Sequence, residues 1–386
     1  MRVLHTADWH VGKKLGRLDR RAETSAVLDE IVGVARERAV DAVLVAGDLF
    51  DRAGPPLESL RIVLDALVRL AATGARVVAI PGNHDSPELF RVLGPLLEGF
   101  GITLVDRPRE PDDGAVVRVP ARDGPGTLRI ACLPFVHEVQ VIDLLGAPDS
   151  GHKAYAQRIR DITAYYARWM VEHPEPGAVD VLMGHFMVHG AVPSGSEREL
   201  HIGEAYMATA DAIPSEIKYA ALGHIHAAQE APGATVPARF CGSVLQLDFG
   251  EAGQRKSVAV VELEPGMKPA RVEQVVLRAG TELVRFVGTF EELEARAPEL
   301  RDSHVHVSIR TEGPESGLAE RVREVLPNAL QVYADYERKG YDLPAREGRS
   351  LTELYRDYWQ HKKGVEPSTE LVEAFEGLLS ETGVSW

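Results

Sequence analysis

Cysteine and long apolar runs are both scarce in this sequence of 386 residues. The two cysteines, Cys132 and Cys241, lie in apolar, strand-like surroundings and form no Cys-x-x-Cys pair. We therefore expect two small core residues, and neither a disulfide nor a zinc site. Charged residues interrupt every apolar run well before the roughly 18 residues of a membrane-spanning helix, and residues 1–5 lack the apolar core of a signal peptide. The sequence predicts a cytoplasmic protein that does not span a membrane.

Basic residues are in the minority as well. The chain has 43 Lys and Arg against 58 Asp and Glu, which gives a net charge of −15. This balance excludes a protein that binds nucleic acid over its whole surface, so any DNA contact must be local, assisted by cations or shared with a partner. One basic cluster stands within nine residues: Lys13, Lys14, Arg17, Arg20 and Arg21. Charge alone favours a solvated loop and helix start here, and the alternative is a DNA contact by Lys13, Lys14 and Arg17.

The composition, with 45% hydrophobic and 26% charged residues, is that of a globular protein, and the length indicates two or three domains. In the first half, short β-branched runs alternate with amphipathic segments. We expect strands at 2–7, 42–46 and 76–80, with helices at 21–39 and 57–72 between them. This order is the βαβ pattern of a sheet covered by helices, which makes the fold α/β.

The rest of the chain predicts a second sheet and two smaller parts. A hairpin at 115–133 and a helix at 153–171 precede further strands, at 179–183, 218–222, 238–241, 256–263 and 271–277. After these, strands at 283–288, 304–309 and 329–334 alternate with helices at 291–297 and 315–325. We predict a main domain at 1–279, a small α+β capping domain at 280–336, a linker at 337–349 and a helical segment at 350–386.

Polar residues that can bind metals follow five of the predicted strands directly. They are Asp8 and His10, Asp48, Asn83, His185, and His224 and His226. The carboxyl ends of strands in an open α/β sheet are where ligand sites form. Since side chains at i and i+2 of an extended chain point the same way, we expect each Asp-x-His or His-x-His pair to share one ion.

Seven ligands exceed the four of a tetrahedral zinc site, but they suit two ions about 3.5–4 Å apart that share a carboxylate. Asp48 is the expected bridge, because it follows the central strand. Carboxylate, amide and imidazole ligands without thiolate favour two Mn²⁺, with Fe²⁺ or Mg²⁺ as alternatives. Such a pair of ions clamps a phosphate and activates a water for in-line attack.

One histidine of these motifs is assigned to catalysis. His84, between Asn83 and Asp85, is placed to protonate the leaving oxygen or to stabilise the transition state. We expect Asp85 to fix the tautomer of His84 from outside the metal site. Asp51, three residues after Asp48, is a further candidate to orient His84 or a water.

Together these five motifs resemble the calcineurin-like metallophosphoesterase superfamily, and their surroundings look like the SbcD-type nucleases of bacterial DNA-break repair. The similar stretches are HTADWHVGKKL at 5–15, GDLFD at 47–51, SGSEREL at 194–200, YAALGHIH at 219–226, and the pairs at 242–243 and 256–257. The resemblance implies a core of two packed mixed sheets flanked by helices, with a capping domain.

The same resemblance assigns roles to residues and implies partners. One ion would take Asp8, His10, Asp48 and His226, and the other Asp48, Asn83, His185 and His224, with His84 as the catalytic residue. The implied partners are DNA, an SbcC-type ABC ATPase with a long coiled coil, and a second copy of this chain. For the homodimer contact we expect the helices at 21–39 and 57–72.

The tail predicts two amphipathic helices. Ser350 and Glu353 form a capping box, after which apolar residues recur at helical spacing. The two stripes are Leu351, Leu354, Tyr355, Tyr358 and Trp359, and then Leu371, Phe375, Leu378 and Leu379. They either fold back on the capping domain or dock onto the ATPase, with Tyr358 and Trp359 as anchors.

Three functions are consistent with these motifs. The leading one is a nucleoid-associated, Mn-dependent DNA nuclease with exonuclease and endonuclease activity in repair and recombination. A phosphatase or cyclic-nucleotide phosphodiesterase is the second, although a small substrate does not need the long stretch after residue 263. An inactive binding module is the third, and the intact ligand set with His84 counts against it.

Overall fold

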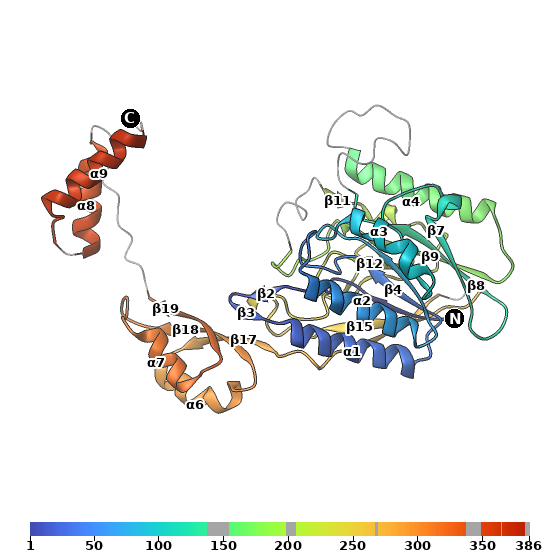
Figure 1. Cartoon of the computed structure of the whole chain (residues 1–386), viewed down its shortest axis with the longest axis horizontal. Helices are drawn as coiled ribbons and strands as arrows, with labels where there is room; N and C mark the ends of the chain where they lie inside the picture. The colour runs from blue at the N-terminus through green and yellow to red at the C-terminus, as the bar shows by residue number, and fades with distance from the viewer. Residues whose placement is uncertain (137–153, 198–205, 267–268, 337–348, 364, 383–386) are drawn as a thin grey trace. The chain divides into compact units, whose positions relative to one another are not determined.

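The computed structural model describes residues 1–136, 154–197, 206–266, 269–336, 349–363 and 365–382. The chain forms two compact units (Figure 1): Met1–Ser308 with Gly317–Tyr333, and Ile309–Ser316 with Ala334–Trp386. The domain boundaries expected from the sequence stay predictions. Among the described residues, no helix is both long and apolar enough to cross a membrane.

The first of the two large sheets is mixed and has six strands, in the order β16-β15-β1-β4-β5-β6. Its strands are β1 (Arg2–Thr6), β4 (Ala42–Ala46), β5 (Arg76–Ile80), β6 (Ile102–Leu104), β15 (Ser257–Glu262) and β16 (Arg271–Val276). β1, β4, β5 and β6 are parallel, as the βαβ pattern predicts, and β15 and β16 add antiparallel partners. The carboxyl ends of β1, β4 and β5 therefore meet at one edge of the sheet.

Three helices connect these parallel strands: α1 (Arg21–Glu37), α2 (Leu57–Ala71) and α3 (Pro87–Glu98). α1 and α2 lie side by side over the sheet (Figure 1) and bury residues at helical spacing, such as Val27 and Ile31 on α1. The sequence patterns did not predict α3, whose Gly94-Pro95 pair is untypical of a helix interior. Ser86 caps this helix by accepting a hydrogen bond from the Leu89 N–H, and Pro87 opens it.

The second six-stranded sheet has the order β13-β14-β12-β9-β8-β7. Its strands are β7 (Val116–Pro120), β8 (Thr127–Leu133), β9 (Ala178–His185), β12 (Tyr219–Gly223), β13 (Gln229–Glu230) and β14 (Ala238–Phe240). Alternation along β9 sends Val181 and Met183 into the core shared with the first sheet, and Leu182 into the core under α4 (Ala154–Glu172). Two packed mixed sheets with helices on their outer faces confirm the predicted fold class. Cys132 and Cys241 are free and buried in the shared core, as expected.

A three-stranded sheet, β17-β18-β19, follows the second large sheet in the chain. Its strands are β17 (Leu283–Gly288), β18 (His304–Arg310) and β19 (Ala329–Asp335), with helices α6 (Phe290–Leu300) and α7 (Leu318–Val325) between them. This confirms the predicted order of elements. Leu283 also packs with Leu15 and Phe249 in a small core of its own.

The tail holds the predicted pair of helices, α8 (Leu351–Lys363) and α9 (Thr369–Thr382). The capping box is confirmed, because the Glu353 N–H donates to the Ser350 hydroxyl and the Ser350 N–H donates to the Glu353 carboxylate. The two predicted stripes partly cover each other, since the rings of Tyr355 and Phe375 stack with centroids 4.1 Å apart. Tyr358 remains 43% exposed.

Candidate metal centre and active site

The ends of five strands bring the seven predicted metal ligands together. β1, β4 and β5 of the first sheet lead to four of them, and the neighbouring strands β9 and β12 of the second sheet lead to the other three. All are at most 6% exposed: Asp8, His10, Asp48, Asn83, His185, His224 and His226. So many buried polar groups at one place are compensated by hydrogen bonds among themselves or by a bound ion.

Asp48 lies at the centre of this group. Its Oδ2 is 3.6 Å from His10 Nε2 and 3.5 Å from His185 Nε2, and these two histidines belong to the different predicted ion sites. The other oxygen, Oδ1, accepts a hydrogen bond of 2.8 Å from the His84 N–H. The carboxylate therefore lies between one histidine of each predicted ion site.

Each predicted ion site has its own cluster of donor atoms. On one side, the Nε2 atoms of His10 and His226 face each other at 3.1 Å, and Asp8 offers a carboxylate oxygen within 4.8 Å of both. On the other side, Asn83 Oδ1 lies 3.1 Å from His185 Nε2 and 2.8 Å from His224 Nδ1. The structure thus brings the seven side chains together. Asp8 also lies within reach of a shared ion with Asp48 and His185, so the division of the ligands between two ions stays a prediction.

The backbone at the ligands is strained. Among the described residues, five that are not glycine have positive φ, and four of these are predicted ligands: Asp8 (52°), His10 (45°), Asp48 (53°) and His224 (91°). Such conformations cost about 1–3 kcal/mol each and persist where function requires them. They also correct an expectation from the sequence, because the Asp8–His10 and His224–His226 pairs do not lie on extended strands. Left-handed turns just beyond the strands aim these side chains.

Glycine leaves the room that the ligands occupy. Gly47 has φ of 92°, and a Cβ there would overlap the imidazole of His185. A Cβ on Gly82 would meet Asp48 and His185. Both glycines are therefore needed for the close approach of the ligands.

The electrostatics of the ligand set fit a bound cation. Burial raises the pKa of Asp8 to about 7, although His185 and His226 oppose this shift. Burial would lower the pKa of His185, but the nearby Asp48 carboxylate outweighs it and the pKa rises to about 9. Burial also holds the pKa of His10 well below its usual range. Without an ion, Asp8 and His185 therefore tend to hold protons. A divalent ion would replace these protons and stabilise the deprotonated ligands, and the carboxylate, amide and imidazole donors suit such an ion.

His84 lies beside this cluster with its ring fixed by the backbone. His84 Nδ1 is 2.8 Å from the Asp51 carbonyl oxygen, and its ring meets that of His10 edge-on at 4.6 Å. The Asp85 carboxylate accepts hydrogen bonds from the N–H groups of Leu49, Phe50 and Gly82, and its role in fixing the His84 tautomer stays a prediction. Asp85 ties the two ligand loops together. The Asp51 side chain forms an ion pair with Lys13 at 3.4 Å.

The basic cluster near the start of the chain divides in the structure. Lys14 and Arg17 are exposed on the hairpin of β2 (Lys14–Leu15) and β3 (Leu18–Asp19), and Lys13 is half-buried. Arg20 instead is buried and donates to the carbonyl of Gln246. A cavity of about 490 Å³ beside Asp51 is lined by Gly12, Lys13, Lys14, Asp19, Arg21, Asp51, Arg52, Pro56 and Ser59.

Several buried residues around the ligands were missed as site residues. Glu197 accepts the backbone N–H of His226, and Glu251 lies 3.2 Å from the His226 Nδ1. Phe135 packs its ring against His185 and His224, with centroids 6.2 and 6.1 Å away. Glu197 lies within the stretch 194–200, and Glu251 lies shortly before the pair at 256–257. No spacing rule connects either glutamate to His226.

Comparison with known proteins agrees with this geometry. Residues 1–228 match the calcineurin-like phosphoesterase family. The SbcD component of nuclease SbcCD from Bacillus subtilis is 30% identical, over 98% of this chain and 98% of that protein. The Escherichia coli K12 protein of the same name is also 30% identical, over 92% of this chain and 90% of its own length. The protein of the same name from Rhodobacter capsulatus is 30% identical, over 70% of this chain and 69% of its own length. The chain therefore belongs to the calcineurin-like phosphoesterase family and, within it, to the SbcD nucleases.

Proposed function

We propose that this metal-dependent phosphodiesterase is a Mn²⁺-dependent DNA nuclease that cuts duplex ends and hairpin-like structures by a two-metal mechanism. The observation that carries the proposal is the position of Asp48, whose Oδ2 lies about equally far from the imidazoles of His10 and His185. The family and its SbcCD relatives support phosphodiester hydrolysis. Mn²⁺ is proposed because imidazole, amide and carboxylate donors meet here without a thiolate.

The roles of the ligands follow from their positions. Asp8, His10 and His226 would hold one ion, and Asn83, His185 and His224 the other, with Asp48 shared. When bound, such ions polarise the phosphate and supply a nucleophilic water at neutral pH. The left-handed turns and the backbone hydrogen bonds of Asp85 keep these side chains in place beforehand, so little reorganisation is left for the reaction.

His84 is proposed as the group that protonates the leaving oxygen. With Nδ1–H donated to the Asp51 carbonyl, the Nε2 of His84 is the nitrogen that would serve the substrate. A ring held in one orientation transfers a proton better than a mobile one. Asp51 would orient the His84 ring through its carbonyl oxygen, and its side chain would pair with Lys13.

Duplex DNA would reach the centre along the basic hairpin. Lys14 and Arg17 are exposed there, and the cavity beside Asp51 is lined by the basic residues Lys13, Lys14, Arg21 and Arg52 and by the carboxylates of Asp19 and Asp51. These side chains concentrate positive charge at one place in a chain with a net charge of −15. Phosphates of DNA are the polyanion that such a patch attracts.

The tail is proposed to bind an SbcC-type ATPase. The stacked Tyr355 and Phe375 hold α8 and α9 against each other, while Tyr358 and Leu378 stay 43% and 59% exposed. An exposed apolar helix pair supports helix docking onto a partner. Deleting residues 345–386 should leave Mn²⁺-dependent cleavage intact and abolish co-purification with the ATPase. A truncated protein that still captures the ATPase at full strength would contradict this role.

For the homodimer, the exposed apolar residues favour α3 over α1. Val92 and Leu96 on α3 are 61% and 67% exposed, Phe100 follows at 60%, and Leu57 at the start of α2 is 81% exposed. The apolar face of α1 is instead buried against the sheet. We propose that α3 and the start of α2 form the contact between two copies.

One assay tests the central activity. Purified protein with Mn²⁺ is offered linear duplex DNA, hairpin-ended DNA, bis-p-nitrophenyl phosphate and p-nitrophenyl phosphate, with Mg²⁺ and Fe²⁺ as alternative ions. We expect cleavage of both DNAs and the diester, and little hydrolysis of the monoester. Faster hydrolysis of the monoester than of DNA would make the protein a phosphatase, and no turnover at all would make it a binding module.

A further inference from the structure

A buried carboxylate lies directly behind one predicted metal ligand. His226 directs Nε2 toward His10, in a cluster that includes Asp8. Its other nitrogen, Nδ1, lies 3.2 Å from Glu251 Oε1 and 2.6 Å from the Ser196 hydroxyl. The Ser196 hydroxyl donates in turn to Glu251. Histidines that bind metals usually donate their second N–H to such a group, which fixes the tautomer and the ring orientation.

Glu251 is itself rigidly held. It is fully buried, and it accepts hydrogen bonds from the Ser243 hydroxyl at 3.2 Å and the Leu247 N–H at 3.1 Å. Its charge is balanced by the buried Lys256, whose Nζ is 2.5 Å from Glu251 and donates at 2.9 Å to the carbonyl of His226. Glu251 and Lys256 thus hold His226 by its ring and its backbone.

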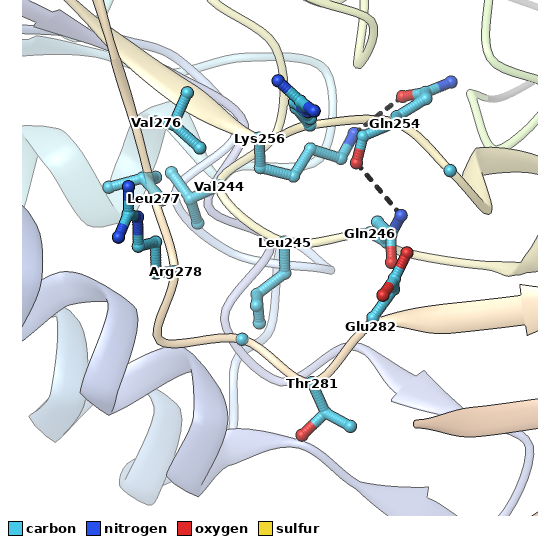
Figure 2. Close-up of a pocket in the computed structure, with 13 residues that line it drawn as sticks. Val244, Leu245, Gln246, Gln254, Lys256, Val276, Leu277, Arg278, Thr281 and Glu282 are labelled. Carbon is cyan, nitrogen blue, oxygen red and sulfur yellow. Dashed lines mark hydrogen bonds between the residues drawn. The ribbon is translucent and has the colours of Figure 1, made fainter. Parts of the chain in front are cut away.

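The Gln246 side chain ties the loop that carries Glu251 to the start of β17, where Phe249 of the loop also packs on Leu283. The Gln246 amide donates to the carbonyls of Glu251 and Gln254, both at 3.0 Å. Its Oε1 accepts the N–H of Leu283 at 2.6 Å. Figure 2 shows Gln246 next to Gln254, which bonds Lys256 on its other side. The Gln246 amide therefore provides a polar link between the support of His226 and the first residue of β17.

A second set of contacts fixes the chain just before β17. Arg20 donates to the carbonyl of Gln246 and forms an ion pair with Glu23 at 2.9 Å. Glu23 also accepts the N–H of Thr281 at 3.0 Å and faces His304 Nε2 at 3.0 Å. The segment 281–283 is thus held at both ends by buried or half-buried polar side chains, beside the cavity of about 510 Å³ in Figure 2.

We propose that Glu251 is a positioning residue for the metal ligand His226, and that Gln246 makes this positioning depend on the 281–283 segment. Four groups hold the Glu251 carboxylate besides His226, and three hydrogen bonds hold the Gln246 side chain that braces the Glu251 loop. The strands β17 to β19 are then coupled to one of the two ion sites, and a shift of segment 281–283 would change how well that ion is held. The inference rests on the proposed two-metal site and does not require DNA as the substrate.

The test is Mn²⁺ binding to metal-free protein, followed by titration and by electron paramagnetic resonance, without nucleic acid. Wild type should bind two ions and give the signal of a coupled pair. Glu251→Gln should weaken one ion about 10–100-fold, the usual effect of losing such a partner, and replace the coupled signal by that of a single Mn²⁺. Glu262→Gln, on the exposed end of β15, is the matched control.

Because Glu251→Gln leaves Lys256 without its buried partner, a second variant guards against misfolding. Glu251→Gln combined with Lys256→Met removes the pair together, and its folding is checked by circular dichroism and thermal unfolding. A folded variant, single or double, that binds both ions like wild type overturns the assignment. Equal weakening of both ions also overturns it, because that is the mark of a general structural role.

The coupling through Gln246 has its own variant. Gln246→Leu should weaken the same ion as Glu251→Gln, while Gln274→Leu on the exposed β16 should leave both ions unchanged. Wild-type affinity in Gln246→Leu removes the coupling from the proposal. A wild-type protein that binds two ions but cuts no DNA would refute the proposed nuclease and leave this inference standing.

Discussion

Replacing His84 with Gln separates catalysis from metal binding. The imidazole has one nitrogen on the Asp51 carbonyl, at 2.8 Å, and its ring stands edge-on to His10 at 4.6 Å. A Gln amide can still donate to this carbonyl, so the fold should tolerate the change. What is lost is a positioned proton donor, which contributes about 10²–10⁴ in rate. That range corresponds to about 3–5 kcal/mol of transition-state stabilisation.

We expect kcat on linear duplex DNA to fall by that factor with little change in KM, the pattern of a group that acts only in the transition state. Bound Mn²⁺, measured by mass spectrometry of the dialysed protein, should stay at two ions. His84 does lie within reach of a shared ion with His10 and Asp48, so loss of Mn²⁺ along with activity would make His84 a ligand and refute the assignment. His189→Gln, with an exposed ring, is the control.

Three further outcomes follow from the same geometry. The basic hairpin residues are Lys13, Lys14 and Arg17. Changing all three to Ser should make the negative slope of log affinity against log salt shallower by up to about 2.7, and should leave cleavage of bis-p-nitrophenyl phosphate nearly unchanged. The pKa values of Asp8 and His185, about 7 and 9 when folded, lie above the ordinary 3.8 and 6.5. In the metal-free folded state these two groups therefore hold protons that the unfolded chain has already lost. Their contribution to stability should fall as pH rises from 3.8 to about 7 for Asp8 and from 6.5 to about 9 for His185. Because Mn²⁺ must displace these protons, it should raise Tm more near pH 9 than near pH 6. Val92→Glu with Leu96→Glu should convert a dimer to a monomer in light scattering, because it places charge on an exposed apolar surface.

Each of these experiments has a matched control and an outcome against it. Arg61→Ser with Arg91→Ser, on α2 and α3, controls the basic hairpin, and equal losses on DNA and on the small diester would move Lys13, Lys14 or Arg17 into the active site. A Tm gain from Mn²⁺ that is the same at both pH values would mean that protons and ions do not compete. Val171→Glu on α4, at a residue 59% exposed, controls the dimer variant. A wild-type protein that is monomeric without the ATPase would contradict the dimer.

The sequence predicted the strand ends well because each one combines a buried β-branched run with glycine and a polar residue. β4 followed by Gly47 and Asp48 is an example, and its bounds agree with the prediction. The sequence did not predict how the ligands are aimed. Asp8 and His10 adopt left-handed backbone that no propensity rule assigns to them, since it is stabilised by contacts such as the His10 N–H to the Asp48 carbonyl.

Partners that come from distant segments are a second feature that the sequence does not predict. Asp85 follows His84 directly, yet its carboxylate bonds the backbone of Leu49, Phe50 and Gly82. Spacing does not link Glu251 to His226 either, because the two contacting residues are 25 positions apart. Such pairs are set by the packing of loops, which periodicity and spacing do not encode.

The most direct test of the two-metal centre is anomalous diffraction from crystals grown with Mn²⁺, recorded at the manganese edge. The geometry of the ligands predicts two anomalous peaks about 3.5–4 Å apart, with the Asp48 carboxylate between them. His10 and His226 should contact one peak, and His185 and His224 the other. A single peak, or two peaks that do not share Asp48, would contradict the two-metal centre.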